Sequence, residues 1–104
     1  MPTRIIRALM LGMLVLPAFA QGDLDQLRTM ADQGNAEAQS NLGFKYADGR
    51  GVPQDNIQAY MWYNLAASNG ADGAAKQRDQ LAAKMSPGDL SEAQRLASEW
   101  KPKK

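Results

Sequence analysis

Apolar and small residues recur along this chain with the period of an α-helix, in stretches separated by Gly- and Pro-containing breaks. The clearest stretch follows Asn35, where Ala38, Leu42 and Tyr46 fall at i, i+4 and i+8 and Gly43 lies beside them. Side chains at this spacing share one face of a helix. The spacing therefore predicts a helix that starts near Asn35.

A second helix follows a Gly-rich break at Asp48–Pro53. Gly admits positive φ, and Pro removes a backbone donor and restricts the residue before it, so the chain must turn here. Asp55 then has the character of an N-cap, with Gln58 at the N3 position of a capping box, and Gly70 suits the C′ position. The apolar stripe between them comprises Ala59, Trp62, Tyr63, Ala66 and Ala67. The two helices form a hairpin whose small residues allow close approach and whose aromatic residues fill the remaining space.

An internal repeat extends this arrangement to both sides of the hairpin. Three small residues recur after 36 positions, namely Ala31, Gly34 and Ala38 and then Ala67, Gly70 and Ala74. A period of about 20–50 residues is typical of a solenoid. The repeat places the helix after Gly70 in register with the first helix of the hairpin.

The hairpin resembles one full Sel-one-like repeat, a relative of the tetratricopeptide repeat with a longer loop between its helices. The matching positions are Ala38, Leu42, Gly43, Tyr46, Gly49, Gly51, Val52, Asp55, Ala59, Trp62, Tyr63, Ala66, Ala67 and Gly70. The resemblance implies an all-α fold, a right-handed α/α superhelix of about five helices over residues 21–100, with one complete repeat at about 35–70 and partial repeats on either side. It also implies protein–protein adaptor work, often in exported bacterial proteins, and carries no universal catalytic residue.

Three further helices are expected around the repeat, at Asp23–Gln33, Ala71–Met85 and Gly88–Trp100. Ser86 and Pro87 give the last one an N-cap and a Pro at N1. Gly73 costs about 1 kcal/mol in a helix interior, so we expect the first turn around it to fray. The last hairpin, joined through Ser86, lacks the Gly-x-Gly-Val loop of the complete repeat. A basic tail at 101–104 follows, expected to be a solvated end, or else to touch anionic envelope lipids or polymers.

The first twenty residues have the pattern of a signal peptide rather than of a folded element. Arg4 and Arg7 precede the apolar run Ala8–Leu16, which is too short for a membrane span of about 20 residues, and an Ala-Phe-Ala cleavage site ends the segment. We therefore expect cleavage before Gln21, no stable membrane span afterwards, and a periplasmic or secreted product.

Composition narrows the class of function. The 84 residues after Ala20 keep all 11 acidic residues and lose two of the 12 basic ones, so their formal net charge is −1 and nucleic acid is not an expected partner. The chain has no His and no Cys, which removes the commonest general base, the commonest nucleophiles and most zinc sites. We expect no enzyme, no catalytic residue, no cofactor and no metal. A hydrolase built on Asp48 and Asp55 remains a remote alternative, since loop and capping roles account for both.

The aromatic residues suggest where a partner would bind. Trp62 and Tyr63 lie on the apolar stripe and are expected in the core, whereas Tyr60 lies off it. Phe44 either packs under the first helix or forms an exposed anchor for a partner. Candidate partner-binding residues are Asn41, Phe44, Lys45 and Asp48. The predicted function is an adaptor for a protein or peptide partner in the cell envelope; the alternative is a periplasmic regulator that restrains an envelope sensor, and self-stacking through open solenoid ends is a further option.

Overall fold

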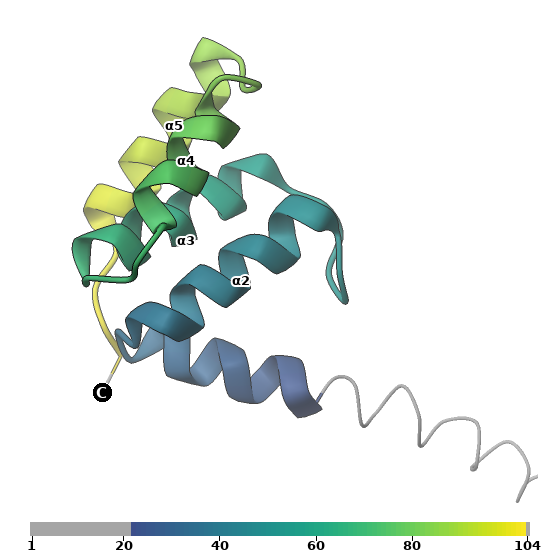
Figure 1. Ribbon diagram of the computed structural model, residues 1–104, viewed down its shortest axis with the longest axis vertical. Coiled ribbons are helices and arrows are strands. Elements are labelled where there is room, and N and C mark those ends of the chain that lie inside the picture. Colours follow the sequence, from purple (N-terminus) through teal and green to yellow (C-terminus); the bar gives the residue numbers. More distant parts are fainter. Residues whose placement is uncertain (1–21, 104) are drawn as a thin grey trace, which may run out of the picture.

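The computed structural model describes residues 22–103, and the helices follow one another as a set of antiparallel hairpins (Figure 1). The predicted signal peptide and Lys104 lie outside the described residues. Within the described range every regular element is helical: a first helix over residues 22–32, then α2 (Ala36–Asp48), α3 (Asn56–Ser68), α4 (Ala74–Ala82) and α5 (Pro87–Glu99). The expected all-α fold of about five helices is confirmed for this part of the chain.

Helix α3 is the centre of the structure, because it packs against α2, α4 and α5. The prediction that Trp62 and Tyr63 belong to the core is confirmed. The predicted apolar stripe was too narrow, however, since Tyr60, Met61 and Leu65 are buried as well. A helix that is apolar on every side is typical of an element surrounded by others.

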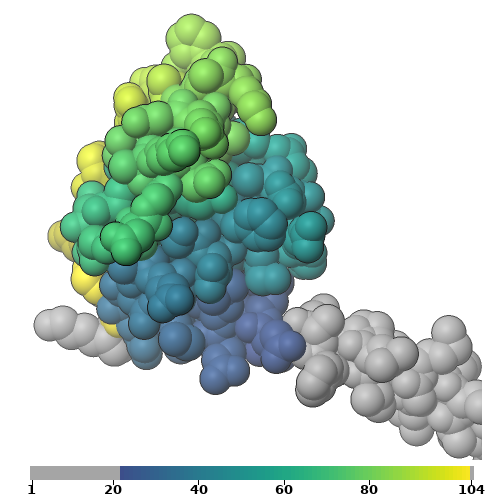
Figure 2. Space-filling view, viewed as in Figure 1, coloured from purple at the N-terminus to yellow at the C-terminus, as the bar shows by residue number. Residues whose placement is uncertain are grey.

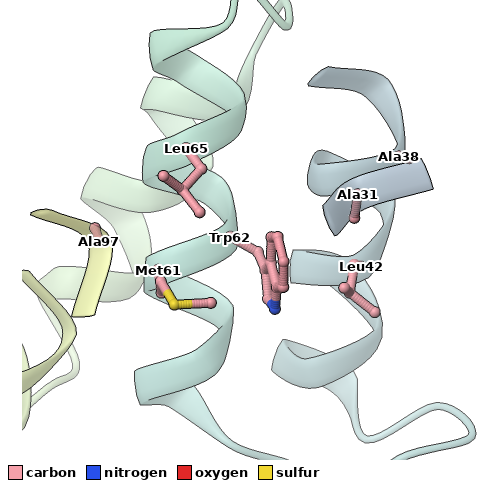
Figure 3. Close-up of a cluster of buried hydrophobic side chains, with 7 residues drawn as sticks. All are labelled: Ala31, Ala38, Leu42, Met61, Trp62, Leu65 and Ala97. Carbon is pink, nitrogen blue, oxygen red and sulfur yellow. The ribbon is translucent and has the colours of Figure 1, made fainter. Parts of the chain in front are cut away.

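Two apolar clusters stabilise the fold, one on each side of α3. In the first, Trp62 extends from α3 toward Leu42 of α2 and Ala31 of the first helix (Figure 3). Trp100, just after α5, packs edge-on against Trp62, with ring centroids 6.3 Å apart and an interplanar angle of 74°. The second cluster joins α3 to α4 and α5 and contains Ala59, Tyr60, Tyr63, Leu81 and Ala93. Each neighbour of α3 therefore contributes to a shared core.

The predicted N-caps of α3 and α5 are confirmed except in one detail. Ser86 caps α5 by accepting a hydrogen bond from the Asp89 backbone N–H at 3.1 Å, and Asp55 caps α3 by accepting from Ile57 and Gln58. The other half of the predicted capping box, in which the Gln58 side chain would accept from the Asp55 backbone N–H, was wrong. The Asp55 backbone N–H donates instead to the Tyr46 carbonyl at 2.9 Å, so a contact across the hairpin replaces the local one.

Helix α4 is shorter than the predicted Ala71–Met85. It begins after Gly73, whose φ of 78° lies in the left-handed region, so the expected fraying is in fact a helix start. At the other end, residues 83–85 form a turn before Ser86. Only Ala74 and Leu81 of α4 are buried.

A buried polar contact that the sequence pattern did not reveal joins the first three helices. Gln39 is 0% exposed; its Nε2 donates to the Ala31 carbonyl at 3.0 Å, and its Oε1 accepts from Asn69 Nδ2 at 2.9 Å. Both polar ends of the side chain are thereby satisfied, as burial requires. Nearby, Arg28 of the first helix donates to the Tyr46 hydroxyl at 3.1 Å.

The tail after α5 turns back to the first helix. The Lys103 backbone N–H donates to the Asp32 carbonyl at 2.7 Å, and Lys103 Nζ lies 3.5 Å from the Asp32 carboxylate. The part of the tail that the structure describes is therefore attached by its backbone, although its side chains are exposed.

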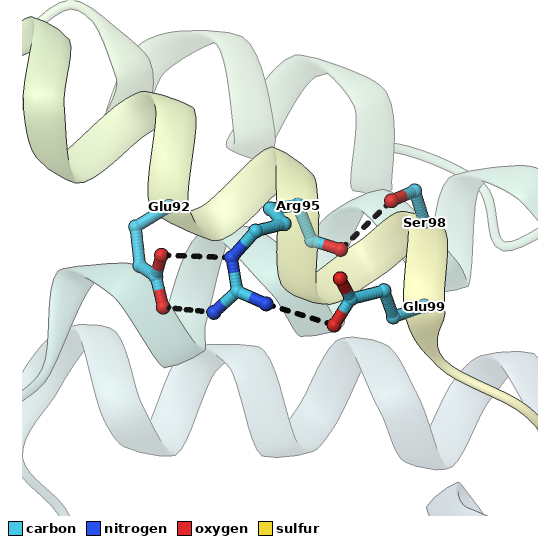
Figure 4. Close-up of polar contacts among 4 residues, drawn as sticks. All are labelled: Glu92, Arg95, Ser98 and Glu99. Atoms are coloured by element: carbon cyan, nitrogen blue, oxygen red, sulfur yellow. Dashed lines mark hydrogen bonds and ion pairs between the residues drawn. The ribbon is translucent and has the colours of Figure 1, made fainter.

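The outer face of α5 is polar, as the end of a solenoid requires. Arg95 pairs with Glu92 at 2.6 Å and with Glu99 at 2.8 Å (Figure 4). Hydrogen bonding from Arg95 holds the pKa of the Glu92 carboxyl below its usual value, and hydrogen bonds to both carboxylates raise the pKa of Arg95. These charges are spaced three and four residues apart on one helix face.

Candidate functional site

Three adjoining clefts, of about 280, 320 and 430 Å³, follow the boundary between α2 and α4. The first and second clefts share Phe44, Tyr63 and Gln77, and the second and third share Ser40, Asn41 and Asp72. Together they form one continuous depression, called here the α2–α4 groove. In the view of Figure 2, the green surface of α4 and the teal surface of α2 meet on the face turned to the reader.

Helical periodicity produces both walls of the groove. On α2, Glu37, Asn41, Phe44 and Asp48 are spaced at i, i+4, i+7 and i+11, which places them on one face. On the α4 side, Gly73, Gln77, Gln80 and Lys84 have the same spacing and line the groove from the opposite side. The groove is thus formed by matching faces of α2 and α4.

The floor of the groove is Tyr63 of α3, held against α2 by a glycine. A Cβ atom added at Gly43 would lie only 3.0 Å from Tyr63 Cδ1 and 3.1 Å from Cε1. Glycine therefore allows the ring to lie flat against the α2 backbone. Although Tyr63 is only 4% exposed, it borders two of the three clefts.

The ionisation of Tyr63 is affected by its surroundings. Burial, and to a lesser extent the negative charge of Asp48, raise the pKa of the Tyr63 phenol above its ordinary value of 10.0. The phenol therefore stays protonated at neutral pH, and it can donate a hydrogen bond.

Phe44 is the large apolar side chain of the α2 wall, and it is 45% exposed. Of the two alternatives for this residue, the structure shows the exposed one. The guanidinium Cζ of Arg50 lies 5.3 Å from the centre of the Phe44 ring, and Arg50 Nε also lies 3.6 Å from an Asp48 carboxylate oxygen. A cation over an aromatic face is attracted to it, so the loop after α2 covers part of the ring.

Three of the four predicted partner-binding residues lie together in the groove. Asn41, Phe44 and Asp48 line it, whereas Lys45 is half-buried and borders none of these three clefts. The prediction missed the wall from α4 and the floor from α3, because each residue was considered on its own helix. The 36-residue repeat contained the signal, since it aligns α4 with α2.

Residues 22–103 were compared with the requirements of a metal site and of a membrane-spanning helix. No group of three or more Asp, Glu, His or Cys residues in the range 22–103 is arranged to hold a metal ion, and no helix in that range is sufficiently long and apolar to cross a membrane. The carboxylate oxygen Oδ1 of Asp55 accepts hydrogen bonds from the backbone N–H groups of Ile57 and Gln58, at the start of α3.

Comparison with known proteins identifies the hairpin. A family model described as Sel1 repeat matches residues 36–70, which span α2, the following loop and α3. The chain is also 39% identical over 51 residues to the secretory immunoglobulin A-binding protein EsiB of Escherichia coli O6:H1. That segment covers 49% of this chain but 10% of the relative, so the chain spans about a tenth of that protein's length. The predicted resemblance is confirmed: this chain contains a Sel1 repeat at residues 36–70, within a tetratricopeptide-like helical fold.

Proposed function

We propose that this protein is an adaptor that binds a partner protein through the α2–α4 groove. The observation that carries the proposal is Phe44, a half-exposed aromatic side chain that borders two clefts and is surrounded by polar groups. A large aromatic residue in a polar rim is typical of the residues that dominate binding energy at protein interfaces.

The family supports a protein partner. Sel1-like repeats belong to the helical repeat architectures whose extended surfaces bind other proteins, and the Escherichia coli relative is named for binding an immunoglobulin. The α2–α4 groove offers such a surface here. The hydrolase alternative would instead require Asp48 and Asp55 as a catalytic pair. Asp55→Asn, which changes a carboxylate that borders none of the three clefts, would then abolish activity while leaving partner binding intact.

We place this adaptor in the cell envelope, on the strength of the signal-like segment Met1–Ala20. Mass spectrometry of the protein purified from its own host tests this directly. A mature N-terminus at Gln21 and recovery in the envelope or culture fluid are expected. An intact Met1 terminus in the cytoplasmic fraction would contradict the proposed location.

Site-specific photo-crosslinking tests the binding surface. The photoreactive amino acid p-benzoylphenylalanine replaces Asn41 in the groove or, as a matched control, Ser91 on α5, which is also exposed. In the host cell, position 41 is expected to crosslink to a specific protein, and position 91 is not. Adding Phe44→Ala should remove the crosslink at position 41 while circular dichroism remains helical.

The outcomes decide between surfaces and roles. Equal crosslinking from both positions, or none from position 41, would contradict the groove as the binding site. If the crosslinked protein is the sensor domain of an envelope signalling protein, the adaptor acts as a periplasmic regulator that restrains that sensor. Deleting the gene should then switch on that signalling response.

A further inference from the structure

The charges of the α2–α4 groove are distributed unevenly along its length. At one end the third cleft is lined by Glu37 and Asp72, and neither carboxylate takes part in the ion pairs formed within residues 22–103. At the other end Asp48 is paired with Arg50, and Lys84 lines the same cleft. The Glu37 end therefore carries the unbalanced negative charge, and a positively charged group on a partner would be attracted there.

Carboxamides line the groove from its middle to the Asp48 end. Asn41 and Gln77 border the middle cleft, and Gln80 borders the first together with Gln54 and Asn56, which hydrogen-bond each other. A carboxamide both donates and accepts hydrogen bonds. It matches the free N–H and C=O groups of an extended backbone, whereas the backbone groups of a helix are already bonded to one another.

The length of the groove sets the size of the ligand. From Glu37 to Asp48, α2 rises about 17 Å, which corresponds to roughly five residues of extended chain. Phe44 lies about 10 Å from Glu37 along the helix axis. In an extended peptide, side chains on the same side are about 7 Å apart at a spacing of two residues and about 13 Å apart at a spacing of four. The distance of about 10 Å between Glu37 and Phe44 lies between these two values.

We infer that the α2–α4 groove binds an extended segment of its partner, with a Lys or Arg side chain at Glu37 and Asp72 and an apolar side chain against Phe44. This inference rests on the proposed function and specifies the ligand of the same site. The bound segment has its basic and apolar residues two or four positions apart. The partner contributes a peptide-like segment rather than a folded surface.

A random heptapeptide library displayed on phage, selected on the full immobilised chain, tests the inference. Peptides enriched on the natural chain are expected to contain Lys or Arg two or four positions from an apolar residue. The double variant Glu37→Lys, Asp72→Lys should enrich Asp or Glu at that position instead. A control with the same change in net charge, Asp79→Lys with Glu99→Lys, alters exposed carboxylates that border none of the three clefts and should keep the basic preference.

A milder variant protects the test against misfolding. Glu37→Gln with Asp72→Asn keeps the shape of both side chains and should weaken binding of a selected fluorescent peptide about two- to tenfold in fluorescence polarisation, with a smaller difference at 1 M salt. Three results would overturn the inference: no enrichment on the natural chain, enrichment without a basic residue, or a basic preference that survives charge reversal. Crosslinking from position 41 separates this failure from failure of the proposed function, because a persisting crosslink shows that the groove binds a protein in another manner.

Discussion

The two walls of the groove differ in how firmly they are attached to α3. Helix α2 has 13 residues, buries Ala38, Gln39, Leu42 and Gly43, and places a glycine directly against the Tyr63 ring. Helix α4 has nine residues and buries only two of them, and the residue at its start has no side chain with which to cap it. The α2 wall is therefore part of the core, whereas the α4 wall rests on it.

This difference has a consequence for binding. Segments with few buried contacts open at lower free-energy cost than core elements. We expect the α4 wall to adjust its position on the fixed α2 wall when a ligand enters. Four measurements, from the largest expected effect to the smallest, compare the α2 wall with less tightly packed parts of the molecule.

Truncating the central leucine of each wall should give unequal losses of stability. Leu42 is 0% exposed and touches the first helix as well as α3, so Leu42→Ala should cost about 3–5 kcal/mol and largely unfold so small a domain. Leu81→Ala should cost about 2 kcal/mol, because α4 can collapse onto the space left behind.

Urea denaturation measures both losses, and hydrogen exchange locates them. In the Leu81→Ala variant, faster exchange should be confined to α4 and the turns beside it. Equal losses from the two variants, or faster exchange that spreads to α2, would contradict the contrast between the walls.

Replacing a glycine by alanine should have opposite effects at the tight α2–α3 contact and at an open position on α5. Gly43→Ala forces the Tyr63 ring away from α2 and should cost about 1–3 kcal/mol, even though Ala is the better helix former. Gly88→Ala in α5 meets nothing within 4 Å and should stabilise the protein by up to about 1 kcal/mol. Urea midpoints that rise for both variants would show that the α2–α3 contact is looser than described.

Alkaline pH should weaken the α2–α3 contact through Tyr63. Its folded pKa is raised, so the folded state keeps a proton that the unfolded state releases near pH 10. The contribution of the Tyr63 phenol to the stability of the natural protein is therefore fully present below about pH 10 and is lost as pH rises above it. Tyr63→Phe removes this contribution, and its urea midpoint should fall less between pH 9 and 11. Parallel loss in both proteins would mean that Tyr63 is not the group responsible.

The smallest effect is expected on the outer face of α5, away from both walls. Arg95→Gln breaks its ion pairs with Glu92 and Glu99, which are exposed to solvent. Because water and salt screen such pairs, the urea midpoint should not change measurably. A clear loss of stability would show that the outer face of α5 contributes more than its exposure suggests.

Local features of the fold could be predicted from the sequence. The caps at Asp55 and Ser86 and the Gly70 stop depend on neighbouring residues only, and the structure has them where expected. The limits of α4 depended on Gly73, which the helical pattern includes but whose backbone conformation begins the helix instead.

Features that depend on distant neighbours were not predictable in this way. Gln39 appears as a polar residue on a surface helix, and only the Ala31 carbonyl and the Asn69 amide explain its burial. Tyr60 lies off the α3 stripe but is covered because α3 has neighbours on several sides. For the same reason, Asn41, Phe44 and Asp48 could be proposed from one helix, while the facing wall from α4 could not.

The attachment of Lys103 to Asp32 bears on how this domain unfolds. In an open array each repeat touches only its neighbours, so unravelling can begin at either end. Here the tail bonds to the end of the first helix, and Trp100 rests on Trp62 in the centre. These contacts between residues far apart in the sequence raise the contact order, and a higher contact order slows folding. They also couple unfolding at one end of the domain to unfolding at the other. Within residues 22–103, we therefore expect opening to begin internally, at α4, and the last helix and the first to be released together.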